Sequence, residues 1–133
     1  MKSMAWLGLV AVALGAQAGE EESTPCDTVE TDQQSFACAA YNRQAADREL
    51  QSAYDELAQR ISDQYPDDTA RANQLMARLQ AAEQLWKQLR EADCQVETFA
   101  EKPGSQALEA AWNTCLAQRS DDRSEYLQSI GQQ

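Results

Sequence analysis

The amino-acid sequence predicts an all-α protein, a three-helix antiparallel bundle with a long helical hairpin and two disulfides at one end. Apolar residues recur at steps of three and four through three long segments, which is the spacing of one face of a helix. No segment shows the alternation or the β-branched runs of a strand. Short segments that contain proline separate the periodic ones, so the helical part of the chain has two turns.

Residues 1–18 have the features of a signal peptide. Lys2 is followed by an apolar run at residues 6–15 and by the small-x-small site Ala16-Gln17-Ala18. This run is too short to cross a bilayer, which takes roughly 20 helical residues. We therefore expect cleavage after Ala18, and a mature protein that is periplasmic or secreted and has no membrane insertion.

Residues 19–31 are expected to form an acidic N-terminal arm. The segment contains Glu20, Glu21, Glu22 and Pro25 and lacks apolar periodicity. We expect Cys26 alone to fix this arm to the rest of the protein. Residues 32–133 are expected to form one helical domain, because the mature chain is long enough for a single modest core.

The domain divides into three predicted helices. The first is expected at about residues 32–64, before Tyr65-Pro66-Asp67-Asp68, where proline ends a helix and an aspartate can cap the next one. The second is expected at about residues 67–99, before the break at Lys102-Pro103-Gly104-Ser105. The third follows Ser105 as its cap and stops at Gly131. The core face expected on the second helix comprises Leu75, Leu79, Ala82, Leu85, Trp86, Leu89, Asp93 and Val96. Four aromatic side chains are also expected in the core: Tyr54, Trp86, Trp112 and Tyr126.

Four cysteines, all in the predicted mature chain, are expected to form two disulfides in an oxidising compartment: Cys26, Cys38, Cys94 and Cys115. Folding the hairpin at Pro66 brings Cys38 to the level of Cys94, so we expect all four at one end of the bundle. Three pairings are compatible with this arrangement. There is no histidine and no Cys-x-x-Cys pair, so we expect no metal site and no cofactor.

The composition favours a binding protein over an enzyme. Without histidine the chain has no Ser-His-Asp triad and no Cys-His pair, and it has no glycine-rich phosphate loop. The formal charge is −11, and loss of Lys2 with the signal peptide makes it −12. This charge argues against nucleic-acid binding and suits a cationic protein partner. We assign no catalytic residue.

Three charged residues lie on or beside the apolar faces: Asp47, Arg90 and Arg123. Such charges are seldom buried unless they are paired. The hairpin brings Asp47 toward Arg90, so we expect ion pairs that fix the helix register.

Two blocks of sequence resemble the LprI-type lysozyme-inhibitor family of exported bacterial proteins. The first is Cys38-Ala39-Ala40-Tyr41 followed by Ala46-Asp47-Arg48-Glu49-Leu50. The second is the more specific, and it reads Ala-Glu-Gln-Leu-Trp-Lys-Gln-Leu-Arg-Glu-Ala-Asp-Cys over residues 82–94.

A third block extends the resemblance to about residues 26–128, with Gly104-Ser105, Cys115-Leu116, Arg123 and Leu127. The chain departs from the family pattern at Gln51, Pro103 and Ser120. The resemblance implies a helical fold and inhibition of a cationic lysozyme by protein association.

Two acidic segments are candidate contacts for a lysozyme. One is the arm with Glu20, Glu21 and Glu22, and the other is the loop at residues 97–105 with Glu97, Glu101 and Lys102. An alternative function is a periplasmic envelope interaction or stress module whose partner the sequence does not identify.

Overall fold

The computed structural model describes residues 22–132. Its elements are three helices, α1 (Asp32–Gln64), α2 (Thr69–Glu97) and α3 (Gln106–Ser129), and the all-α prediction is confirmed. The signal peptide, Glu20 and Glu21 lie outside the described residues. None of the helices within residues 22–132 is long and apolar enough to span a membrane.

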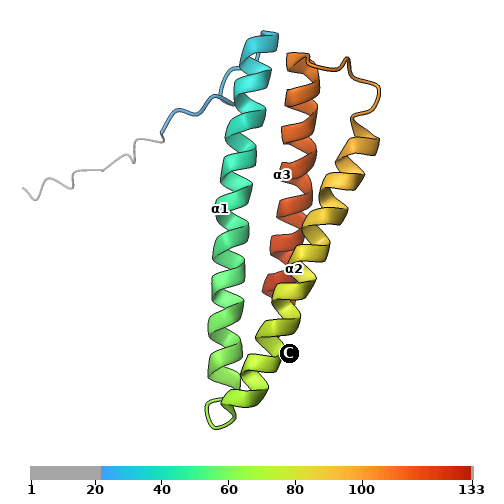
Figure 1. Cartoon of the computed structure of the whole chain (residues 1–133). Helices are drawn as coiled ribbons and strands as arrows, with labels where there is room; N and C mark the ends of the chain where they lie inside the picture. Colours follow the sequence, from blue (N-terminus) through green and yellow to red (C-terminus); the bar gives the residue numbers. More distant parts are fainter. Residues whose placement is uncertain (1–21, 133) are drawn as a thin grey trace, which may run out of the picture.

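Helices α1 and α3 form the main pair of the bundle. They lie side by side, whereas α2 leaves the turn beside the end of α1 and diverges from α1 as it runs back (Figure 1). Most of the contact between helices is accordingly made by α1 with α3. The bundle is therefore a closely packed pair with a third helix leaning against it.

The helix boundaries follow from capping residues. Thr31 begins α1 with a capping box that it shares with Gln34. The side chain of Asp68 accepts from the Arg71 amide at 3.0 Å, and α2 therefore begins at Thr69, two residues later than predicted. Gly131, with φ of 77°, follows the end of α3 in the left-handed conformation that glycine favours.

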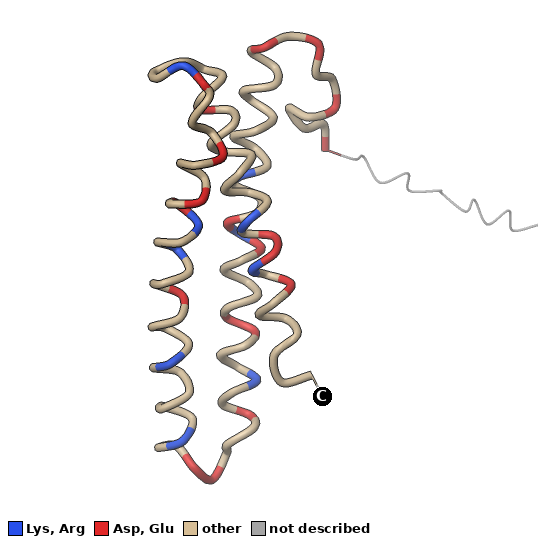
Figure 2. The backbone as a smooth tube through the Cα atoms, turned by 90° about the vertical axis from the view of Figure 1, so that its right-hand side faces the viewer, with Lys and Arg blue, Asp and Glu red and all other residues tan. Residues whose placement is uncertain are grey.

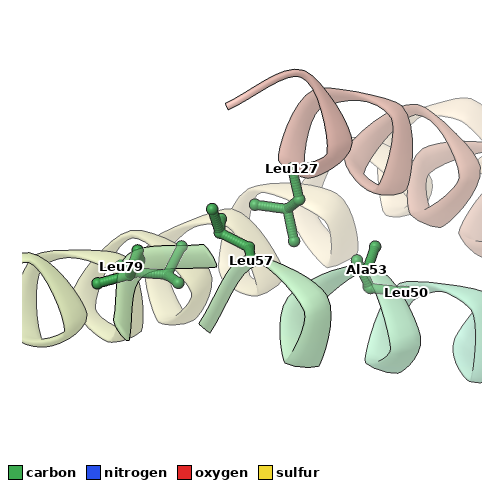
Figure 3. Close-up of a cluster of buried hydrophobic side chains, with 6 residues drawn as sticks. Leu50, Ala53, Leu57, Leu79 and Leu127 are labelled. Carbon is green, nitrogen blue, oxygen red and sulfur yellow. The ribbon is translucent and has the colours of Figure 1, made fainter. Parts of the chain in front are cut away.

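The core consists of two clusters of buried side chains. The larger lies between the three helices and comprises Leu50, Ala53, Leu57, Ile61, Leu79 and Leu127 (Figure 3). The smaller comprises Cys94, Cys115 and Leu116, with Trp112 packed against it. The two clusters follow one another along the bundle, and α1 supplies most of the larger one.

The predicted core face of α2 is partly wrong. Leu79 is buried, but Leu85, Leu89 and Val96 are 67%, 58% and 77% exposed. The side of α2 that packs inward instead carries Glu83. Because Glu83 is charged, apolar periodicity in the sequence does not indicate that this side is a core face. Because α2 touches the other helices along a narrow strip, its second apolar face is left in solvent.

The predictions for the four aromatic side chains are likewise correct in part and wrong in part. Tyr54 and Trp86 pack against the larger cluster and Trp112 against the smaller one, all of them partly buried. Tyr126 is 54% exposed, so its assignment to the core is wrong. Its place at the margin of the helix pair leaves much of the ring in solvent.

Two disulfides join the four cysteines, as predicted. Cys26 bonds to Cys38, which we call the arm bridge, and Cys94 bonds to Cys115, which we call the loop bridge. The arm bridge fixes the N-terminal arm to the second turn of α1. The loop bridge joins the last turn of α2 to α3 across the connection at residues 98–105.

Candidate functional site

A buried ion pair links the middle of α2 to α3. The carboxylate of Glu83 accepts from Arg123 Nε at 2.7 Å, and Arg123 Nη2 lies 2.6 Å from the same oxygen. Their side chains are only 11% and 13% exposed. The sequence singled out Arg123 as a paired charge but did not identify Glu83 as its partner.

A second arginine, Arg90, links α2 to both other helices. Its Nη1 lies 3.9 Å from Asp47 on α1 and donates to the Ser120 hydroxyl on α3 at 3.1 Å. Its guanidinium also lies over the Trp86 ring, 5.0 Å from the centroid. Asp47 and Arg90 thus face each other in a geometry that ties α2 to α1 and α3, and both line a pocket of about 520 Å³ that is formed by residues of α1 and α2.

A second and larger opening is a groove at the end of the bundle that holds both bridges. It has a volume of about 720 Å³ and receives residues from α1, from the end of α2, from the connection and from the start of α3. We call it the bridged-end groove. Its lining comprises Arg43, Gln95, Thr98, Phe99, Glu101, Pro103, Leu108, Glu109, Trp112 and Asn113.

Local structure holds the connection that forms one wall of this groove. The loop bridge joins the two helices on either side of it, from Cys94 to Cys115, and the Thr98 hydroxyl donates to the Cys94 carbonyl at 2.7 Å in a buried position. Gly104 adopts φ of 74°, a conformation that favours glycine, and Ser105 then caps α3 by accepting from the Leu108 amide at 3.1 Å. The connection is therefore a braced turn.

The groove combines apolar side chains with free carboxylates. Phe99, 89% exposed, and Trp112 both line it. Within residues 22–132, Glu101 and Glu109 make no ion pair, whereas Arg43 is held by Asn113 at 3.0 Å and by Asp47 at 3.8 Å. The unengaged charge in the groove is therefore negative.

Glu97, predicted to contact a partner, is already engaged. Its carboxylate accepts from Arg119 of α3, and this hydrogen bond raises the pKa of the Arg119 guanidinium above its usual value. Arg119 thus stays charged at every ordinary pH. Glu101 lines the groove and Lys102 is exposed next to it.

The two acidic segments predicted from the sequence do not form one site. The N-terminal arm lies on the far side of α1 from the connection between α2 and α3, in both views of the molecule (Figures 1 and 2). Glu22, at the start of the described chain, is exposed, and Asp27 accepts from the Thr24 amide at 2.9 Å. Carboxylates elsewhere are scattered along all three helices (Figure 2).

Several groove residues escaped the sequence analysis. Leu108 and Trp112 are one helical turn apart on α3, a spacing that also fits a core face, and Trp112 was assigned to the core for that reason. Arg43 and Asn113 are 70 positions apart in the chain, and only the packing of α1 on α3 brings them together. Glu109, in the first turn of α3, had no distinguishing signal.

Comparison with known proteins gives one family and one similar structure. The family model described as lysozyme inhibitor LprI matches residues 26–127. A crystal structure of a DUF1311 family protein from Pseudomonas putida KT2440 is 62% identical, with a TM-score of 0.70, over 80% of this chain and 99% of that one. No curated protein matches the chain. Since the match covers both bridges, the three helices and the groove, the chain belongs to the LprI lysozyme-inhibitor family.

Proposed function

We propose that this protein is an exported inhibitor that binds lysozyme and blocks it by protein association. Membership of the LprI family is the observation that carries the proposal. The formal charge of −11 agrees with it, because a strongly acidic protein is steered toward a cationic enzyme at low ionic strength.

The bridged-end groove is the contact surface that we assign to this activity. Its aromatic residues Phe99 and Trp112 offer apolar area, and Glu101 and Glu109 offer carboxylates that no other described residue neutralises. A lysine or arginine side chain could lay its aliphatic part along the rings and its charge toward the carboxylates. The loop bridge holds this surface in place before binding, which lowers the entropy lost on association.

The test is inhibition of a purified cationic lysozyme by the oxidised mature chain and by a charge-reversed groove variant. Glu101→Lys with Glu109→Lys should raise the inhibition constant by ten-fold or more, on the order of 1.4 kcal/mol, because two favourable charges become repulsive. The matched control is Glu56→Lys with Glu125→Lys, which makes the same change of charge at exposed positions outside the groove. The control should lose only the part of the inhibition that depends on the net charge of the protein.

Two results would count against this assignment. Equal loss of inhibition in both double variants would mean that net charge alone drives binding and that the groove has no special part. Absence of inhibition by the unmodified oxidised chain would contradict the proposed function and favour an envelope interaction module. Retained bridges and helix content must be shown for each variant.

The same proposal includes export with loss of residues 1–18. The signal-peptide pattern at Lys2, residues 6–15 and Ala16-Gln17-Ala18 supports it. The mass of the protein recovered from the periplasm or the medium should correspond to a chain that begins at Gly19. A retained N-terminus would contradict this part of the proposal.

A further inference from the structure

Helix α2 carries an apolar face that no other part of the described chain covers. We call it the outer face of α2, and it comprises Ala82, Leu85, Leu89, Ala92 and Val96 on the helix and Phe99 in the turn that follows it. All six are exposed, and the four large ones range from 58% to 89%. These four are most of the large apolar side chains that the described chain leaves in solvent.

The spacing along this face is that of a coiled-coil seam. Its five helical residues follow one another at alternating steps of three and four, the heptad pattern that packs a helix against another helix. The inner side of α2 uses different residues, Leu79, Glu83 and Cys94, and is already occupied. The outer face is therefore a second packing surface, and it meets the bridged-end groove at Phe99.

The lack of charged residues on this face distinguishes between a cationic partner and a second copy of the chain. None of its six residues is charged, and of the four heptad positions that flank the seam between Leu85 and Val96, Trp86, Gln88 and Gln95 are neutral and Asp93 is acidic, in a chain whose formal charge is −11. A cationic partner would gain more electrostatic attraction at the acidic surfaces elsewhere on the protein than at this face. Two copies of an acidic chain, however, repel each other least where carboxylates are few.

The residues at the two ends of the face set a direction. Arg78 continues the heptad one step before Ala82, and Glu101 lies just beyond Phe99. Both are exposed, and neither makes an ion pair within residues 22–132. An antiparallel pair brings the arginine of each copy toward the glutamate of the other, whereas a parallel pair sets like charges together.

The antiparallel arrangement also matches side-chain size. With Leu89 of one copy opposite Ala92 of the second, Leu85 meets Val96 and Ala82 meets Phe99, so that a smaller side chain faces a larger one in each layer. An interface of this kind is isologous and closes on itself. We propose that two copies of this protein associate through the outer faces of α2, antiparallel, to form a dimer.

The expected dimer is weak. The seam spans fewer than three heptads, which places the interface at the small end of specific ones and the Kd on the order of micromolar. Sedimentation equilibrium of the oxidised mature chain over a concentration series should show reversible conversion of monomer to dimer. A monomer throughout the series, up to about 1 mM, would overturn the proposal.

Substitution on the face tests its location. Leu85→Gln with Leu89→Gln should weaken dimerisation by at least about ten-fold, since it removes two leucines from each copy. The matched control is Val29→Gln with Tyr126→Gln, two residues outside α2 that are 48% and 54% exposed, and it should dimerise like the unmodified chain. Equal dimerisation of both variants would overturn the assignment to α2. Because Leu85 and Leu89 do not line the bridged-end groove, lysozyme inhibition should survive. Loss of inhibition together with a monomeric unmodified chain would assign the face to lysozyme instead.

Charge reversal tests the direction. Arg78→Glu alone and Glu101→Arg alone should each weaken the dimer several-fold, and the two together should restore it. Failure of the combination to restore association would overturn the antiparallel arrangement.

Discussion

Replacing Glu83 by alanine should destabilise the protein by about 3 to 5 kcal/mol, a large fraction of the stability of a domain this small. The reason is that Arg123 loses its ion-pair partner. Arg123 Nε and Nη2 lie 2.7 Å and 2.6 Å from one Glu83 oxygen, and the arginine side chain is only 13% exposed. Without the carboxylate, Arg123 stays largely out of water with no counter-charge.

The aromatic contacts of Arg123 compensate little. Its guanidinium carbon lies 5.6 Å from the centroid of the Trp86 ring and 4.9 Å from that of Tyr126, and such contacts are worth about 0.5 to 2 kcal/mol each. They persist in the variant, so they moderate the loss without replacing the carboxylate. Glu83→Gln, which keeps an acceptor oxygen, should cost less, about 1 to 3 kcal/mol.

The assay is urea unfolding followed by far-UV circular dichroism, with both bridges intact. A double variant, Glu83→Met with Arg123→Met, removes the charges together and should lie within about 1 kcal/mol of the unmodified protein, because a buried ion pair contributes little net stability over apolar packing. A loss below about 1 kcal/mol for Glu83→Ala would refute the reasoning. So would a double variant as unstable as the single one.

Three further sets of variants test the packing by the same unfolding measurement. Removing the loop bridge by substituting both cysteines with alanine should lower the free energy of unfolding by about 3 kcal/mol. Removing the arm bridge should lower it somewhat less, because the loop bridge closes a loop of 21 residues and the arm bridge one of 12. The reverse order would contradict this account. Leu57→Ala, at a side chain 1% exposed, should cost about 2 to 5 kcal/mol, whereas Leu85→Ala, at one 67% exposed, should cost the monomer less than about 0.5 kcal/mol. A comparable loss at the two positions would mean that the outer face of α2 is buried. Thr31→Ala should cost about 1 kcal/mol by removing the capping box of α1, and an unchanged stability would show that the first turn is held by the arm bridge instead.

The helices could be predicted from the sequence because their signals are local. Proline and capping residues mark the turn between α1 and α2, and Asp68, one of the two aspartates expected to cap, begins α2. The existence of two bridges also followed from the number of cysteines and from the expected export. Their pairing did not, because it depends on how far α2 diverges from α1, and no periodic pattern encodes that angle.

The prediction of which face of α2 packs inward was partly wrong, and the error has a physical cause. Its outer face, with Leu85, Leu89 and Val96, is more apolar than its inner one, where Glu83 and Arg90 occupy core positions through pairing with other helices. A charge that is buried because of a distant partner looks like a surface residue in the sequence. The groove escaped prediction likewise, since it is assembled from segments of all three helices.

The most direct test of the proposed function is a titration of lysozyme with the oxidised mature chain, read as the rate of cell-wall clearing at low and at moderate salt. The proposal predicts that clearing slows in proportion to added protein until one partner is saturated. The effect should weaken as salt screens the attraction and should disappear when the two bridges are reduced. Unchanged clearing with excess protein, at low salt and with both bridges intact, would contradict it.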